Sequence, residues 1–152
     1  MSYIKDISLF LVIAFFANLG SHLIETDFLM VYLKSNLTTV QLGLLAINTA
    51  TCGLVVSKLQ EIKQKHVEIN VKPITNQLLL SLKEQIILII VGIISMILIA
   101  SNVFNNCNYC EYIKFGLETL LVAVFINSVQ VLWDTGKSVF VLIDFMIESD
   151  DE

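Results

Sequence analysis

The chain has 152 residues, of which 56% are hydrophobic and 15% charged, and its mean hydropathy is +0.79. These values lie outside the range of soluble globular domains and predict an integral membrane protein. The net charge of −5 says little about partners, and nothing in the sequence indicates direct binding of nucleic acid. Phosphate-binding loops, hydrolase nucleophile motifs and zinc-protease motifs do not occur in the sequence, and we expect neither an enzyme nor a bound cofactor or metal.

Four apolar stretches have the length that a membrane-spanning helix needs, roughly 20 residues. They cover approximately residues 7–24, 37–57, 85–104 and 113–133. The first follows Lys5 and Asp6 and ends without a clear small-residue cleavage site, which favours a retained span over a cleaved signal peptide. We therefore predict an all-α integral membrane protein with four transmembrane helices, helical cytoplasmic extensions and an oligomeric state.

The first span carries a polar stripe near its outer end, made of Asn18, Ser21, His22 and Glu25. A histidine and a carboxylate three residues apart suit a proton-sensitive pair, but we favour the interpretation that they cap the bundle at the headgroup level. The apolar run 28–33 that follows either extends the first helix or lies on the outer surface. The candidate caps of the second span are Ser35, Asn36, Thr38 and Thr39.

The second span has two unusual faces. Small residues form a ridge at steps of three and four, namely Gly43, Ala46, Ala50, Gly53 and Ser57. Gln41 and Asn48 lie on roughly the opposite face. One interpretation is a subunit interface along the small-residue ridge and a water-facing wall along the amides. The other is ordinary packing within one chain, with the amides hydrogen-bonded between helices.

Residues 58–84 form the predicted cytoplasmic loop. Its first part, 58–66, keeps helical character and extends the second span into water. Pro73 interrupts the chain, and Thr75 is a candidate cap for a helix with an apolar face at residues 78–82. The third span is nearly all Ile, Leu and Val and is expected to face lipid.

Cys107 and Cys110 form a C-x-x-C pair in the predicted outer loop. On the oxidising side of a bacterial membrane such a pair suits a local disulfide. A redox role would need a thioredoxin-like frame that the sequence lacks, and a zinc site would need further ligands.

The fourth span carries a polar stripe along its whole length, made of Gly116, Thr119, Ala123, Asn127, Gln130, Asp134 and Lys137. Such a face must meet protein or water, because lipid would not satisfy it. The predicted lining of a polar pathway is therefore Gln41, Asn48, Asn127, Gln130 and Asp134. The tail 138–152 either continues the fourth helix in the cytoplasm, packed on residues 78–82, or the fourth span slides inward and buries Asp134 with Lys137. We favour the continuation, because burying both charges is costly.

Orientation follows from the nine lysines, since the chain has no arginine. Seven of them precede the first span, follow the fourth or lie between the second and third, and two, Lys34 and Lys114, lie on the opposite side. The positive-inside rule then places both termini and the loop 58–84 in the cytoplasm.

The small-residue ridge of the second span runs directly into the Lys/Glu-rich segment 58–66, and a charged tail follows the fourth span. In this architecture the chain resembles small four-span inner-membrane effectors of bacterial phage defence, the RexB-type exclusion proteins and the retron-linked effectors. It differs from RexB-type chains in lacking arginine. The resemblance implies a membrane effector that forms or opens an ion pathway when a cytosolic partner signals infection.

We therefore expect a homo-oligomer in the lipid bilayer of the bacterial inner membrane, with an ion-conducting pathway and a cytosolic partner protein at 58–84 and 138–152. The alternative is a non-conducting anchor or assembly subunit that recruits a cytosolic protein. A holin-like lysis protein is a third possibility, which the long cytoplasmic part disfavours.

Overall fold

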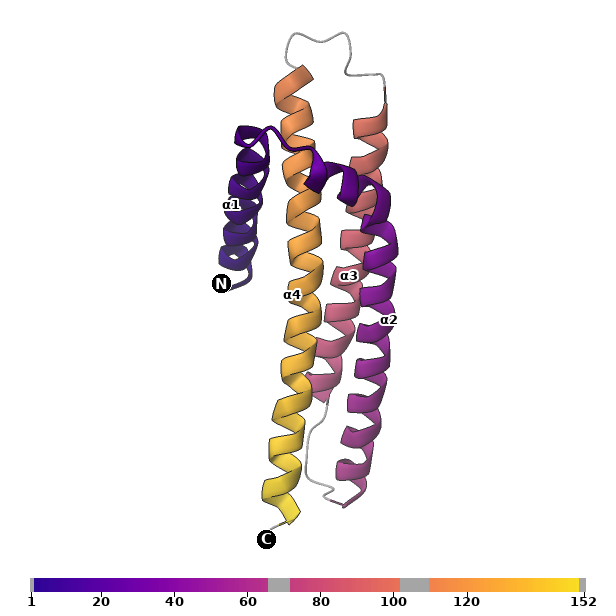
Figure 1. Ribbon diagram of the computed structural model, residues 1–152. Coiled ribbons are helices and arrows are strands. Elements are labelled where there is room, and N and C mark those ends of the chain that lie inside the picture. Colours follow the sequence, from indigo (N-terminus) through magenta and orange to yellow (C-terminus); the bar gives the residue numbers. More distant parts are fainter. Residues whose placement is uncertain (1, 66–71, 102–109, 151–152) are drawn as a thin grey trace.

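The computed structural model describes residues 2–65, 72–101 and 110–150, and the side chains of residues 8–64, 72–101 and 111–140. These residues form four α-helices: α1 (Ser2–Leu23), α2 (Phe28–Lys65), α3 (Lys72–Ala100) and α4 (Cys110–Asp150). Helices α2, α3 and α4 make one elongated bundle, and α1 lies beside α4 (Figure 1). The predicted all-α fold is confirmed for the described residues.

Three stretches of helix are long and apolar enough to cross a membrane: Phe28–Gln64, Lys72–Ala100 and Glu111–Phe140. The described apolar part of α1, Ser8–Leu23, is shorter. These lengths and compositions are those of a membrane protein. The first predicted span, over residues 7–24, stays a prediction.

The interior of the α2–α3–α4 bundle repeats every seven residues. The repeat runs through Gln41, Asn48, Val55 and Ile62 of α2, Leu78, Gln85 and Gly92 of α3, and Leu121, Ser128 and Thr135 of α4, all of them buried. A seven-residue period keeps the same stripe of each helix against its neighbours, as in left-handed coiled coils. Polar and apolar layers therefore follow one another along the bundle axis.

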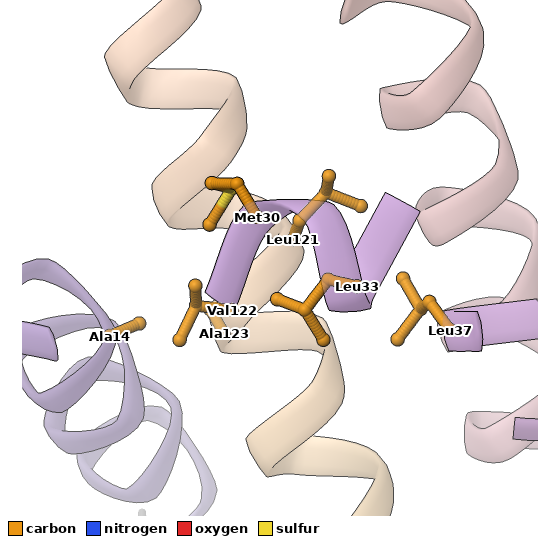
Figure 2. Packing of buried hydrophobic residues seen from close by; sticks show 7 residues of the cluster. All are labelled: Ala14, Met30, Leu33, Leu37, Leu121, Val122 and Ala123. Atoms are coloured by element: carbon orange, nitrogen blue, oxygen red, sulfur yellow. The ribbon is translucent and has the colours of Figure 1, made fainter. Parts of the chain in front are cut away.

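Apolar clusters lie on both sides of the polar layers. The outer cluster, seen in Figure 2, consists of Ala14, Met30, Leu33, Leu37, Leu121, Val122 and Ala123. The inner cluster consists of Cys52, Val55, Leu59, Ile62 and Leu78, with Leu82 and Val139 packed against it. The contact made by Val139 agrees with a continuation of the fourth helix packed on residues 78–82, and α4 runs unbroken to Asp150.

Two predicted helix starts are wrong. The Thr26 hydroxyl accepts a hydrogen bond from Phe28 N, and Val31 N donates to Asp27 O at 2.9 Å, so α2 begins at Phe28. The predicted caps at 35–39 consequently lie inside α2. Residues 28–33 are the first turns of α2, which run across the bundle before the helix turns along it (Figure 1), and they do not extend α1. Helix α3 begins at Lys72, so Thr75 lies inside the helix and does not cap it. Pro73 is in the first turn, where a backbone N–H would have no partner within the helix and its absence therefore costs nothing.

From Gln85 to its end, helix α3 turns its polar side chains inward and most of its isoleucines outward. Gln85 and Ser95 are buried. The exposed residues of this part include Ile86, Ile87, Ile90, Ile93, Ile94 and Ile97. The exposed face of this part of the helix is apolar, as expected for a helix that faces lipid.

A tight turn closes α1 and redirects the chain into α2. Thr26 N donates to Ser21 O at 3.0 Å, Glu25 N donates to His22 O at 3.2 Å, and Glu25 has a φ of 54°. These two bonds around a left-handed residue define a Schellman motif, in which glycine normally occupies the left-handed position. Glutamate there carries the steric cost of its Cβ.

We predict that Glu25→Gly stabilises the protein by about 0.5–1 kcal/mol, because relief of the left-handed strain exceeds the extra chain entropy of glycine in the unfolded state. The measurement is thermal unfolding in detergent, followed by circular dichroism. Glu25→Ala is the matched control, since it removes the carboxylate and keeps the Cβ. Equal midpoints for the glycine and alanine variants would contradict the prediction.

Candidate membrane-embedded polar site

Two layers of amide and hydroxyl side chains lie inside the α2–α3–α4 bundle. In the first layer, Gln41 Nε2 donates to Ser128 Oγ at 3.2 Å and to the backbone oxygen of Leu88 at 3.3 Å. Gln41 and Ser128 are fully buried. The two bonds of Gln41 join α2 to α3 and α4, and the Ser128 hydroxyl in turn donates to Val124 O within α4.

The second layer lies seven residues further along α2. Asn48 Nδ2 donates to Gln85 Oε1 at 2.7 Å and to Ser81 Oγ at 3.5 Å. The hydroxyls of Ser81 and Thr135 are 2.9 Å apart and share a hydrogen bond. Amide and hydroxyl pairs of this kind hold helices together in an apolar medium, where an unpaired amide is costly.

The predicted pathway residues of α2 therefore lie between helices. Gln41 and Asn48 are enclosed by α3 and α4, so in this arrangement they form hydrogen bonds between helices rather than a water-facing wall. The small-residue ridge faces the opposite way. Its five members, Gly43, Ala46, Ala50, Gly53 and Ser57, are all exposed. A Cβ placed at Gly43 or Gly53 would meet no atom within 4 Å, so the ridge takes no part in packing within the described chain.

A glycine on α3 is needed for the first layer. A Cβ at Gly92 would come within 3.1 Å of Gln41 Oε1 and within 3.4 Å of Leu37 and Val124. A larger side chain at this position would displace the Gln41 amide, because buried neighbours on two helices already surround it.

Helix α1 covers the outer half of the polar stripe on α4. Asn18, which is 2% exposed, donates to Thr119 Oγ1 at 3.0 Å and to Phe115 O at 3.3 Å. Ala14 points toward Val122 and Ala123 (Figure 2). His22 stacks on the Phe115 ring. Among the described residues the ion pairs do not include a contact between His22 and Glu25, so the proton-sensitive pair is not formed.

The inner half of the stripe faces outward from the bundle. Gln130 Nε2 donates to both carboxylate oxygens of Asp134 at 3.1 Å, and Lys137 Nζ lies 3.2 Å from the same carboxylate. The lysine also lies over the Trp133 ring, 5.5 Å from its centre. We name Gln130, Trp133, Asp134 and Lys137 the α4 charge cluster. Asn127, one turn before it, is half-buried.

The hydrogen bonds establish which residues of the three helices lie at the same level. Ser81 contacts both Asn48 and Thr135. Asn48 stands near the middle of the uncharged run 35–57 of α2, about 13 Å from its inner end at a rise of about 1.5 Å per residue. Asp134, the neighbour of Thr135, therefore lies level with the middle of that run and not with its end.

The uncharged runs of the helices are consequently staggered. Helix α3 carries Lys83 at a level where α2 is still apolar, and its own uncharged run begins at Gln85, beside Asn48. A flat hydrocarbon layer centred on the run of α2 takes in Lys83 and the α4 charge cluster. A layer centred on α3 and α4 instead leaves Leu54, which is 71% exposed, outside it.

Sequence reasoning missed four other side chains of the two layers: Ser81, Gln85, Ser128 and Thr135. It also missed the ion pair between Lys34 and Glu118, whose Nζ and Oε1 atoms are 3.4 Å apart at the outer end of the bundle. The available signal was spacing, because Ser128 and Thr135 repeat the seven-residue interval between Gln41 and Asn48. The proposed disulfide involves Cys107, which lies outside the described residues.

Comparisons of the chain with models of protein families, with curated proteins and with solved structures found no match. The assignment of function rests on the residues of the chain itself.

We predict that Gly92→Leu destabilises the protein by about 1–3 kcal/mol, because the added side chain overpacks the first amide layer. Gly116→Leu is the matched control, because a Cβ at this exposed glycine would meet no atom within 4 Å, and it should leave the stability of the chain unchanged or slightly raised. The measurement is loss of helical circular dichroism on titration with denaturing detergent. Equal effects of the two substitutions would contradict this account of Gly92.

Proposed function

We propose that this protein is an oligomeric inner-membrane protein that forms or gates an ion-conducting pathway. The observation that carries the proposal is the α4 charge cluster, which lies in the candidate membrane helix Glu111–Phe140, level with the middle of the uncharged run of α2, and faces away from its own bundle. The side chains of Asp134 and Lys137 are 57% and 56% exposed.

In a hydrocarbon layer centred on the uncharged run of α2, lipid is a poor surrounding for this cluster. A charged side chain at the centre of a membrane helix costs roughly 2.5–3.5 kcal/mol even on the most lenient scale. Pairing with Lys137 and Gln130 lowers this cost for Asp134 but leaves more than half of each charged side chain uncovered. A second subunit, or water held between subunits, would satisfy the exposed groups. Polar residues that face water inside a membrane line the paths of ions.

The small-residue ridge of α2 supports assembly into an oligomer. Ridges of this kind let helix backbones approach closely in lipid, where van der Waals contact drives association. The ridge ends at Ser57, and the exposed ion pair between Lys58 and Glu61, 2.7 Å apart, follows it directly. A second copy aligned in parallel would meet the same pair and exchange its partners, which adds charge complementarity to the apolar contact.

The lysine distribution supports an orientation with both termini and the loop 58–84 in the cytoplasm. In that orientation the surface built from 58–84 and 138–152 is available to a cytosolic partner. Together with the resemblance to phage-defence effectors, this favours a role in abortive infection, in which a partner reports infection and the membrane protein responds by depolarising the cell.

A non-conducting anchor or assembly subunit is the second candidate function. One observation favours it: Gln41 and Asn48 are fully buried and bonded between helices, so each subunit is closed along its own axis. In this case the exposed ridge and the α4 charge cluster would be contact surfaces for other proteins of the assembly.

We predict that Gly43→Leu combined with Gly53→Leu weakens the homo-oligomer, because leucine side chains separate backbones that must approach closely. The measurement is the mass of the detergent-solubilised protein by light scattering during size exclusion. Gly116→Leu is the control, since it adds the same bulk at another exposed glycine with open space around it. A wild type that runs as a monomer would refute the oligomer.

We predict that Asn127→Leu combined with Gln130→Leu abolishes conduction, because apolar side chains dewet a narrow passage. Asp134→Asn should reduce cation preference and keep the path open, since it removes charge and little volume. The measurements are a potential-sensitive dye in expressing cells and currents in planar bilayers with purified protein. Val129→Leu, on an exposed apolar position of the same helix, is the control. Unchanged potential and absent current for the wild type would favour the anchor function.

A further inference from the structure

We propose that the interior of the α2–α3–α4 bundle binds water molecules at its two amide layers. The inference goes beyond the proposed function and does not depend on it. Its starting point is a pair of orphaned atoms: among the described residues, Gln41 Oε1 and Gln85 Nε2 are buried side-chain atoms without a hydrogen-bond partner. Both residues are 0% exposed. An unpaired polar group in an apolar interior is destabilising, so a hydrogen-bond partner is expected for each of these atoms.

Exchanging the nitrogen and oxygen positions of the side-chain amides does not give every buried polar atom a hydrogen-bond partner. With its amide turned, Gln85 would present Nε2 to Asn48 Nδ2, and two donors would face each other at 2.7 Å. Turning Asn48 as well would restore that bond but would leave Gln85 Oε1 unpaired instead. A turned Gln41 would place its oxygen against Leu88 O, an acceptor that now receives a bond at 3.3 Å. In every orientation one atom of each layer lacks a partner.

The chemistry of the orphaned atoms identifies the ligand. The orphaned atom is an acceptor in the Gln41 layer and a donor in the Gln85 layer, and turning the amides exchanges these roles. Water both donates and accepts hydrogen bonds, so it can pair with the orphaned atom of either layer in either orientation of the amides. Water is therefore the small neutral ligand that suits both layers.

Each layer also offers the further partners that a buried water needs, two to four in all. The Gln41 layer contains the Ser128 hydroxyl and the carbonyl oxygen of Leu88. The Gln85 layer contains the hydroxyls of Ser81 and Thr135, which lie 2.9 Å apart. Above and below, the outer and inner apolar clusters confine this hydration to the polar layers.

The test is proton-detected solid-state NMR of the deuterated, 15N-labelled full chain in lipid bilayers, with transfer of magnetisation from water to side-chain amides. We expect water contacts at the side chains of both Gln41 and Gln85, as at the exposed amide of Asn36. The backbone amide of Leu121, buried in the outer apolar cluster, is the dry control. Absence of the water contact at either glutamine, with the Asn36 signal present, overturns the proposal.

Discussion

The hydrogen bond between Asn48 and Gln85 is the contact on which the arrangement of this protein depends. It joins α2 to α3 at 2.7 Å in the interior, and the Ser81 and Thr135 hydroxyls extend the same layer to α4. Apolar helices can slide past each other by a turn at little cost, because one leucine resembles the next. An amide in an apolar interior loses several kcal/mol when it loses its partner. The polar layers therefore determine the register of the helices, and the apolar clusters fill the space on either side.

The outward features follow from that register. Once Gln41 and Asn48 point inward, the small residues on the other side of α2 must point outward, because the two sets lie on opposite faces of one helix. The same register sets Asp134 level with the middle of the uncharged run of α2. Helix α4 contacts the other three helices. One half of its polar stripe is covered by α1, and the other half forms the exposed charge cluster.

Much of this fold can be predicted from the sequence, because apolar length and helical spacing are local properties. The four helices and the opposed faces of α2 follow from runs of residues and from the rotation of 100° per residue. Which face turns inward does not follow, since both small residues and amides are used at helix contacts in membranes. The partners Gln85 and Ser128 were missed for a related reason. The hydrogen-bond partner of a single polar residue in an apolar run depends on which residue of the neighbouring helix lies opposite it. That pairing is set by the register of the helices in three dimensions, which the sequence of one helix does not contain. The start of α2 was also misplaced, because Thr26 and Asp27 precede an apolar turn that reads as part of the preceding connection.

The close approach of Gly92 to Gln41 has a consequence for how this protein can change in evolution. The two residues lie on different helices, 51 positions apart, yet the space for the amide exists only because position 92 has no side chain. A relative that replaces Gln41 with a smaller residue gains room for alanine or serine at position 92. One that retains the glutamine must retain the glycine. Among descendants of this chain the two positions should therefore covary, while Gly43 and Gly53 change independently of the residues inside their own bundle.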